Sequence, residues 1–271
     1  MRYVGVDITG ANRDWDWILI DDDYGAPWHR RGGHDDLLAF LRDRRPNVVA
    51  IDAPSKRNCG LMRQAHVRRD VLGERLAERT KAGRLLYEDC RVSEAELGVR
   101  HIKSYFTSGT RSPPDWVGAG LRLYEDLAAL GYMTWDEPGP VSTLGSGIDQ
   151  VAIETYPHAC FVVRLGWIPQ LKTSLAGCLE RIACLKAWGD ELRVELGASE
   201  GILQEIGALR WEHILEHGAP RSLSHDKLDA LAAALTAKLV AQNPAVAYAV
   251  GRKADGVIVL PGRPLSAYHA K

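Results

Sequence analysis

The sequence lacks a charge excess of either sign, because 34 Lys and Arg face 35 Asp and Glu in 271 residues. This balance argues against a protein that coats nucleic acid over its whole surface. No apolar run approaches the roughly 18 residues that span a bilayer, so we expect neither a membrane anchor nor secretion. The five cysteines form no Cys-x-x-Cys pair, which argues against a disulfide framework or a cysteine zinc site and favours the reducing cytoplasm.

Hydrophobic residues make up 46% of the chain and charged residues 25%, which is typical of a globular protein with a sizeable core. The charge is segregated, since residues 56–111 hold 13 Lys and Arg but only 7 Asp and Glu. One interpretation is a basic surface that grips phosphates locally. The other is a solvated helical face on which charges pair at i, i+4 spacing. The sequence leaves both interpretations open.

The first fifty residues predict three strands, a helix and a fourth strand. Short β-rich runs separated by turn residues are expected to form an antiparallel meander at 2–7, 15–20 and 26–30. Leucines at helical spacing predict a helix that begins at Asp35 and ends before Pro46. Val48–Asp52 is apolar up to its last residue, as in a strand that is buried on both faces.

The remaining residues complete an α/β fold. The stretch from about 55 to 150 is too long for a simple crossover and predicts an inserted basic cap of helices and loops, followed by a crossover helix. Three further elements follow: a fifth strand at 151–154, a long helix at 226–240, and a terminal hairpin at 246–250 and 257–260. We therefore predict one domain over residues 1–271 around a mixed five-stranded sheet flanked by helices.

Two aspartates end predicted strands and are expected to meet. Asp7 and Asp52 each follow an apolar run, and a right-handed crossover places such strands side by side in parallel. Two carboxylates at that distance repel each other unless one binds a proton or a cation lies between them. For either residue alone, a strand-end cap is the simpler interpretation. Together they indicate acid–base chemistry or a metal site.

The last long helix adds further candidates. Asp226 and Asp229 are one turn apart and share a face. Asp226 also suits the first turn of a helix, where a carboxylate complements the dipole. Asp229 precedes an apolar run, and an unpaired carboxylate there is costly without a cation or donor. His225 beside them is either a proton shuttle, a phosphate contact or a polar surface residue.

Glu154 ends the fifth strand as Asp52 ends the fourth, and it is either a site residue or the partner of a nearby arginine. Oxygen ligands without cysteine suit a hard cation, so we predict Mg²⁺ or Mn²⁺ held by Asp7, Asp52 and Asp229. Clustered carboxylates with such ions hydrolyse phosphoesters. The predicted catalytic set is therefore Asp7, Asp52, Glu154, Asp226 and Asp229.

The arrangement of acids resembles the RNase H-like superfamily, and the Ser224–Leu235 segment resembles the closing helix of Holliday-junction resolvases of the RuvC type. Four motifs together resemble the family called domain of unknown function 429, described as predicted RNase H-like nucleases: Gly5–Asp7, Ala50–Pro54, Ile153–Pro157 and Ser224–Leu235. The resemblance spans about residues 3–240. It implies three antiparallel strands, two more strands parallel to the first, and a nuclease activity.

Basic and aromatic residues supply candidate substrate contacts. Lys56 and Arg57 follow Asp52 closely, and Arg111 lies in the loop at 107–114, so all three are predicted to clamp phosphate together with His225. Arg111 equally suits a role in pinning that loop. Some of the eight tryptophans could stack on bases, although core packing explains most of them; the eight include Trp15, Trp17, Trp28, Trp116 and Trp135. The expected partner is DNA or RNA, and a homodimer is left open.

Three functions follow from these residues. The first is a metal-dependent nuclease. The second is an actin-like or sugar-kinase-like ATP-binding protein, indicated by the Asp7–Gly10 loop and the glycines of Gly145–Asp149. The third is a non-catalytic binding module with an RNase H-like fold. A lysine or arginine that neutralised the acidic cluster would argue against the nuclease.

Overall fold

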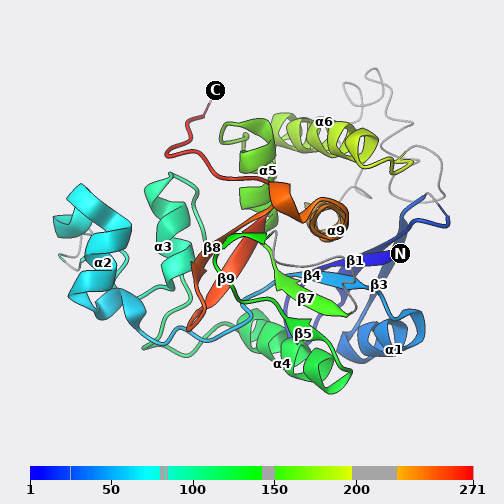
Figure 1. Ribbon diagram of the computed structural model, residues 1–271, viewed down its shortest axis with the longest axis horizontal. Helices are drawn as coiled ribbons and strands as arrows, with labels where there is room; N and C mark the ends of the chain where they lie inside the picture. Colours follow the sequence, from blue (N-terminus) through cyan, green and yellow to red (C-terminus); the bar gives the residue numbers. More distant parts are fainter. Residues whose placement is uncertain (25, 80–82, 84, 142–149, 197–224, 271) are drawn as a thin grey trace.

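The computed structural model describes the chain except for residue 25 and residues 80–82, 84, 142–149, 197–224 and 271 (Figure 1). Its centre is a six-stranded mixed sheet with the strand order β3-β2-β1-β4-β7-β5. The strands are β1 (Arg2–Asp7), β2 (Trp15–Asp21), β3 (Trp28–Gly32), β4 (Val48–Asp52), β5 (Met133–Thr134) and β7 (Val151–Glu154). The order β3-β2-β1-β4 is typical of RNase H-like folds.

The pairing follows the predicted pattern with one correction. β1, β2 and β3 form the antiparallel meander, and β4 and β7 lie parallel to β1 and β4 respectively. The predicted five-stranded sheet is wrong by one strand, because β5 adds a parallel edge strand beside β7. β5 has two residues, which is too short to produce an alternating pattern of apolar residues.

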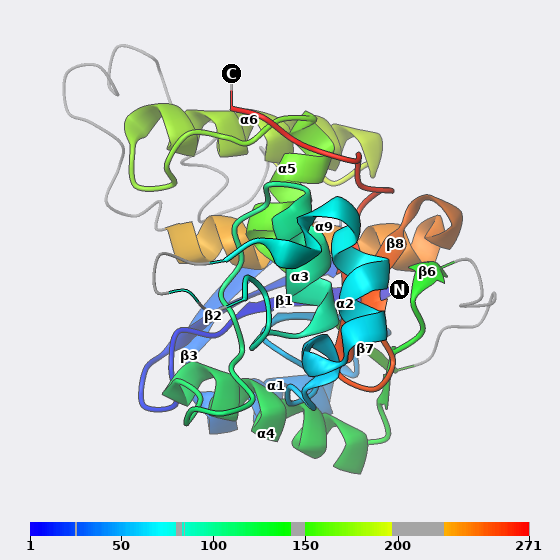
Figure 2. The same ribbon diagram turned by 90° about the vertical axis from the view of Figure 1, so that its left-hand side faces the viewer.

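Helices cover both faces of the sheet (Figures 1 and 2). On one face, α1 (His34–Arg44) and α4 (Asp115–Ala129) enclose a core that includes Leu37, Val49 and Leu123. On the other face, α9 (His225–Gln242) lies directly on β1, β2 and β4. α5 (Pro157–Leu165) and α6 (Leu175–Glu191) pack on α9 from outside. No described helix has the length and apolar character that a membrane span requires.

Helix α9 is buried along nearly its whole length, from Leu228 to Val240. Its alanines allow the helix backbone to reach the sheet, and Gly5 of β1 faces them. A Cβ atom at Gly5 would overlap the backbone of Ala230 and of Ala234. Glycine is therefore required in the middle of β1 by this close approach. The predicted helix at 226–240 is confirmed, whereas Ser224, the first residue of the Ser224–Leu235 motif, lies outside the described residues.

Residues 55–150, which we predicted as an inserted cap, belong to more than one part of the fold. α2 (Ala65–Leu72) and α3 (Val92–Val99) form a separate small core with Met62 and Cys90. α4 belongs to the layer that covers the main sheet, as expected for the crossover helix, and β5 belongs to the sheet itself. The described residues also form three short 3₁₀ helices: Leu61–Arg63, Gly73–Ala77 and Pro244–Val246.

The predicted terminal hairpin is present as β8 (Tyr248–Arg252) and β9 (Gly256–Leu260). It forms a second, three-stranded sheet with β6 (Gly139–Pro140), which the sequence did not reveal. Thr155, directly after β7, bridges to Val259 of β9, and α3 packs on β8 (Figure 1). The hairpin thus joins the cap helices to the end of β7.

We expect Gly5→Ala to lower the free energy of unfolding by about 3 kcal/mol or more, because the new methyl group forces α9 away from β1. Chemical denaturation measures this change. Gly118→Ala on α4 is the control, since a Cβ atom there meets no heavy atom within 4 Å. That variant should be neutral or more stable by up to about 1 kcal/mol. Equal effects of the two substitutions would contradict the proposed contact.

Candidate metal centre

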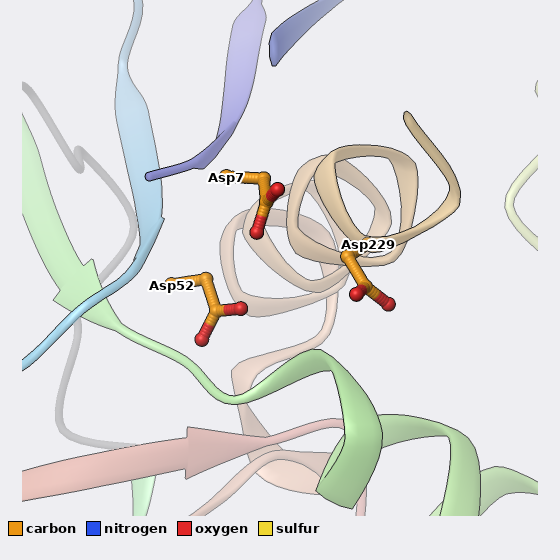
Figure 3. Close-up of side chains that lie close together, drawn as sticks. All are labelled: Asp7, Asp52 and Asp229. Atoms are coloured by element: carbon orange, nitrogen blue, oxygen red, sulfur yellow. The ribbon is translucent and has the colours of Figure 1, made fainter. Parts of the chain in front are cut away.

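Three aspartates from distant parts of the chain meet at one edge of the sheet. Asp7 ends β1, Asp52 ends β4 and Asp229 lies in the second turn of α9. Each offers a carboxylate oxygen, and these oxygens all lie within 4.8 Å of one another (Figure 3). Asp7 and Asp229 are buried, whereas Asp52 is partly exposed. The structure thus brings together the three residues that the sequence predicted as metal ligands.

The fold explains why these side chains converge. Asp7 and Asp52 are paired in the parallel register of β1 and β4, so both carboxylates leave the sheet at the same edge. Asp229 precedes Ala230, whose carbonyl faces Gly5, and this contact places the start of α9 beside the end of β1. The register of one strand pair and one helix contact therefore build the cluster.

The carboxylates repel one another. Burial, followed by the charges of Asp52 and Asp229, raises the pKa of Asp7 well above its ordinary value. Loss of solvation and the charge of Asp229 raise the pKa of Asp52 from 3.8 to about 8. Burial also raises the pKa of Asp229. Such like-charge clusters are relieved by a proton or a cation, as expected for a metal site.

A lysine touches the cluster without neutralising it. Lys172 Nζ lies 3.2 Å from Asp229 Oδ2, and the lysine side chain is 45% exposed. This single ammonium group does not balance the three carboxylates, since the pKa of Asp7 and that of Asp52 stay raised in its presence. The pKa of Asp229 stays raised even though Lys172 opposes that shift. A lysine that neutralised the cluster would have argued against a nuclease, and Lys172 neutralises it only in part.

The cluster opens into a cavity of about 510 Å³. Asp7 and Asp52 line it together with Asp226, His225 and the lysine of the rim. The lining also includes Tyr105 and Thr107, from the segment between α3 and α4, and Trp116 at the start of α4. The acidic cluster thus borders a partly open cavity whose lining mixes charged, polar and aromatic side chains.

Glu154 also lines the cavity, but both of its carboxylate oxygens accept hydrogen bonds from other residues. Arg91, which is buried, donates to both carboxylate oxygens of Glu154, from Nη2 to Oε1 at 2.5 Å and from Nη1 to Oε2 at 2.9 Å. The backbone N–H of Ser55 also donates to Oε2, at 2.7 Å. The arginine partner that the sequence allowed is therefore present. A catalytic role for Glu154 stays a prediction.

The other predicted residues lie in different places. Asp226 and His225 pair with each other at 3.0 Å, and Asp226 stands outside the group of three ligands. The Lys56 ammonium group donates hydrogen bonds to the Asp136 carboxylate, at 2.8 Å, and to the carbonyl of Lys253. Arg57 and Arg111 are exposed, and neither lines the cavity. Their predicted contacts with phosphate remain predictions.

Several residues of the cavity escaped the sequence reasoning. Lys172 and Tyr105 lie in irregular segments, where no periodic pattern marks a position. Arg13, in the loop between β1 and β2, likewise carried no signal. Tyr156 lies within the Ile153–Pro157 motif, so the sequence could have indicated it. The glycines at 145–149, which indicated ATP binding, lie outside the described residues.

Comparison with known proteins supplies a family and no activity. The family model described as "Protein of unknown function (DUF429)" matches residues 5–251. This stretch contains all three clustered aspartates and every residue of the cavity lining except Ile258. No curated protein and no solved structure matches the chain.

We expect the metal-free protein to become less stable as the pH rises from about 4 to about 8. The raised pKa of Asp52 means that the folded protein binds more protons than the unfolded chain in this interval, so the free energy of unfolding falls with pH. Thermal melts at about pH 5 and about pH 8 measure the decline. Asp52→Asn should flatten it.

Asp136→Asn is the matched control for this pH dependence. Hydrogen bonds from Lys56 and Lys253 outweigh the effect of burial and lower the pKa of Asp136, so this residue cannot cause a loss of stability above pH 4. A decline that Asp136→Asn flattens as much as Asp52→Asn would show that the three-aspartate cluster is not its source.

We expect Lys172→Met to raise the affinity for Mn²⁺ about fivefold, because the ammonium group competes with the cation for Asp229 in a partly solvated position. Isothermal titration calorimetry measures the affinity. Lys186→Met is the control, since Lys186 is exposed on α6. An unchanged or weaker affinity in Lys172→Met would show that Lys172 does not oppose metal binding.

Proposed function

We propose that this protein, which belongs to the DUF429 family, is a divalent-metal-dependent hydrolase of phosphodiester bonds in nucleic acid. One observation carries the proposal: three aspartates present oxygens within 4.8 Å of one another, and Lys172 compensates only part of their charge. Keeping such a group together is costly for stability and is typical of functional sites.

The donor atoms suit Mg²⁺ or Mn²⁺. The three candidate ligands are carboxylates, and neither cysteine nor histidine belongs to this group among the described residues. Hard cations prefer such oxygen donors. When bound, an ion of this kind activates water and stabilises the leaving oxygen of a phosphoester. Asp7, Asp52 and Asp229 hold it, and their fixed places on β1, β4 and α9 keep its position constant.

The cavity supplies the remaining groups. Arg13, Lys172 and His225 line it and provide positive charge for a phosphate. Asp226 holds His225 through the contact of 3.0 Å. Glu154 acts as a positioning residue, because its two oxygens fix Arg91 and the backbone of Ser55 on the wall. The RNase H-like strand order supports nucleic acid as the polymer that is cleaved.

We expect Asp7→Asn, Asp52→Asn and Asp229→Asn each to reduce Mn²⁺-dependent cleavage by at least about 100-fold, since the ion contributes several kcal/mol to the transition state. The assay uses single-stranded, duplex, hybrid and branched substrates with Mg²⁺ or Mn²⁺. Calorimetric titration with Mn²⁺ should show the same three variants to bind the ion more weakly.

Asp16→Asn is the matched control for these variants. Asp16 lies opposite Asp7 in the register of β1 and β2, is buried, and pairs with His29 at 2.6 Å instead of joining the cluster. It should retain metal binding and cleavage. Cleavage that survives all three cluster substitutions would refute the site, and metal binding without cleavage of any substrate would indicate a non-catalytic binding module.

A further inference from the structure

We infer that the cavity holds one unpaired nucleobase packed against the ring pair of Tyr105 and Trp116, so that the substrate is a single-stranded segment of nucleic acid, an inference that rests on the proposed function. Both aromatic side chains line the same cavity as Asp7 and Asp52. Aromatic rings beside basic groups are the usual binding surface for unpaired bases, and Arg13 and Lys172 supply such groups in the same cavity.

The two rings pack edge to face, and we call this pair the aromatic platform. Their centroids are 5.2 Å apart and their planes meet at 77°, so a base stacks on the face of one ring and meets the edge of the other. Tyr105 is 51% exposed, which is unusual for a large aromatic side chain that serves only packing. In contrast, Trp15, Trp17 and Trp135 are buried in the core. Among the tryptophans that the sequence singled out, Trp116 is thus the one that lines the cavity.

The fold fixes this platform beside the acidic cluster. Gly120 of α4 packs against Ala53 and Ile8, the residues that directly follow Asp52 and Asp7. Trp116 lies one helical turn earlier on α4 and therefore on the same face of that helix. Gly10, in the loop after β1, approaches the Asp115 carboxylate. A base on Trp116 accordingly lies next to the edge of the sheet where the three aspartates meet.

The segment that carries Tyr105 is held at both ends. Tyr156, two residues beyond β7, donates its hydroxyl to the Lys103 carbonyl at 2.8 Å. The backbone N–H of Thr107 donates to Glu94 Oε2 at 2.8 Å, and the Asn58 side chain donates to the carbonyl of Thr107 at 2.8 Å. Tyr105 therefore rests on a fixed backbone, which reduces the entropy that is lost when a base binds.

A buried hydroxyl on the cavity wall supplies a polar contact for the base. Thr107 is 3% exposed and lines the cavity, and its Oγ1 has no hydrogen-bond partner among the described residues. A buried polar atom without a partner is costly and rare. The donors and acceptors on the edge of a base satisfy it, which a purely apolar ligand does not.

The aromatic lining favours an unpaired base over a duplex. Within a duplex both faces of each base are covered by neighbours, so an aromatic platform has no face to bind unless the base is flipped out. A cavity of about 510 Å³ accommodates a ligand of the size of a nucleotide. Arg13 and Lys172 of the lining then meet the phosphate while the aromatic platform meets the base.

Fluorescence anisotropy with labelled oligonucleotides of about twelve nucleotides tests the inference. The measurements use the Asp52→Asn background without divalent metal, so that no strand is cut. Tyr105→Ala and Trp116→Ala should each weaken binding of the single strand by about 5- to 100-fold. Tyr105→Phe, which keeps the ring, should bind like the parent. The matching duplex should be little affected by any of these changes.

Phe106→Ala is the matched control. Phe106 is the next residue, is 40% exposed and contacts Tyr87, and it does not line the cavity. It should change binding less than twofold. Equal losses for Phe106→Ala and Tyr105→Ala, equal losses for the duplex, or a parent protein that does not bind single strands would each overturn the inference.

The outcomes separate this inference from the proposed function. If Mn²⁺ binds at the three aspartates and duplex is cleaved while Tyr105→Ala changes neither binding nor cleavage, the platform is wrong and the hydrolase stands. If Tyr105→Ala weakens single-strand binding but Mn²⁺ does not bind, the hydrolase is wrong. The cavity is then a binding site for unpaired bases.

Discussion

The site depends on the close approach of α9 to β1. Helix and strand backbones touch where Gly5 faces Ala230 and Ala234, and a larger residue at position 5 would separate them. This contact brings Asp229 to the sheet edge where Asp7 and Asp52 already lie side by side. The alanine-rich sequence of α9 is therefore as important for the site as Asp229 itself, because small side chains permit the approach.

Packing of the helix forces like charges together. The apolar contacts along α9 and the parallel pairing of β1 with β4 oppose the mutual repulsion of three carboxylates, and Lys172 relieves only part of it. The resulting upward shifts in pKa measure how strongly the fold holds the group in place. A preorganised cluster of this kind loses little by rearrangement when a cation enters, which suits catalysis better than stability.

Much of this arrangement was predictable from sequence, for identifiable reasons. Asp7 and Asp52 stand at the ends of apolar runs, and Asp229 interrupts an apolar helix, so the pattern of polar and apolar residues indicated all three. The sequence did not indicate Lys172, Arg91 and Tyr105, because these residues lie in irregular segments, where side chains follow no periodic pattern. Proximity in sequence was also a poor guide, because Lys56 follows Asp52 closely, yet its side chain binds Asp136 and does not line the cavity. β5 and β6 were too short to leave a pattern.

The buried arginine at the start of α3 makes the cap inseparable from the sheet. Arg91 lies among Glu94, Glu154 and the carbonyl of Asp255, and its charge compensates the acids around it. Excising the cap to obtain a minimal domain would leave Glu154 and Asp255 without this counter-charge beneath newly exposed apolar surface. Although the cap interrupts the order of strands along the chain, its removal would therefore favour aggregation and proteolysis.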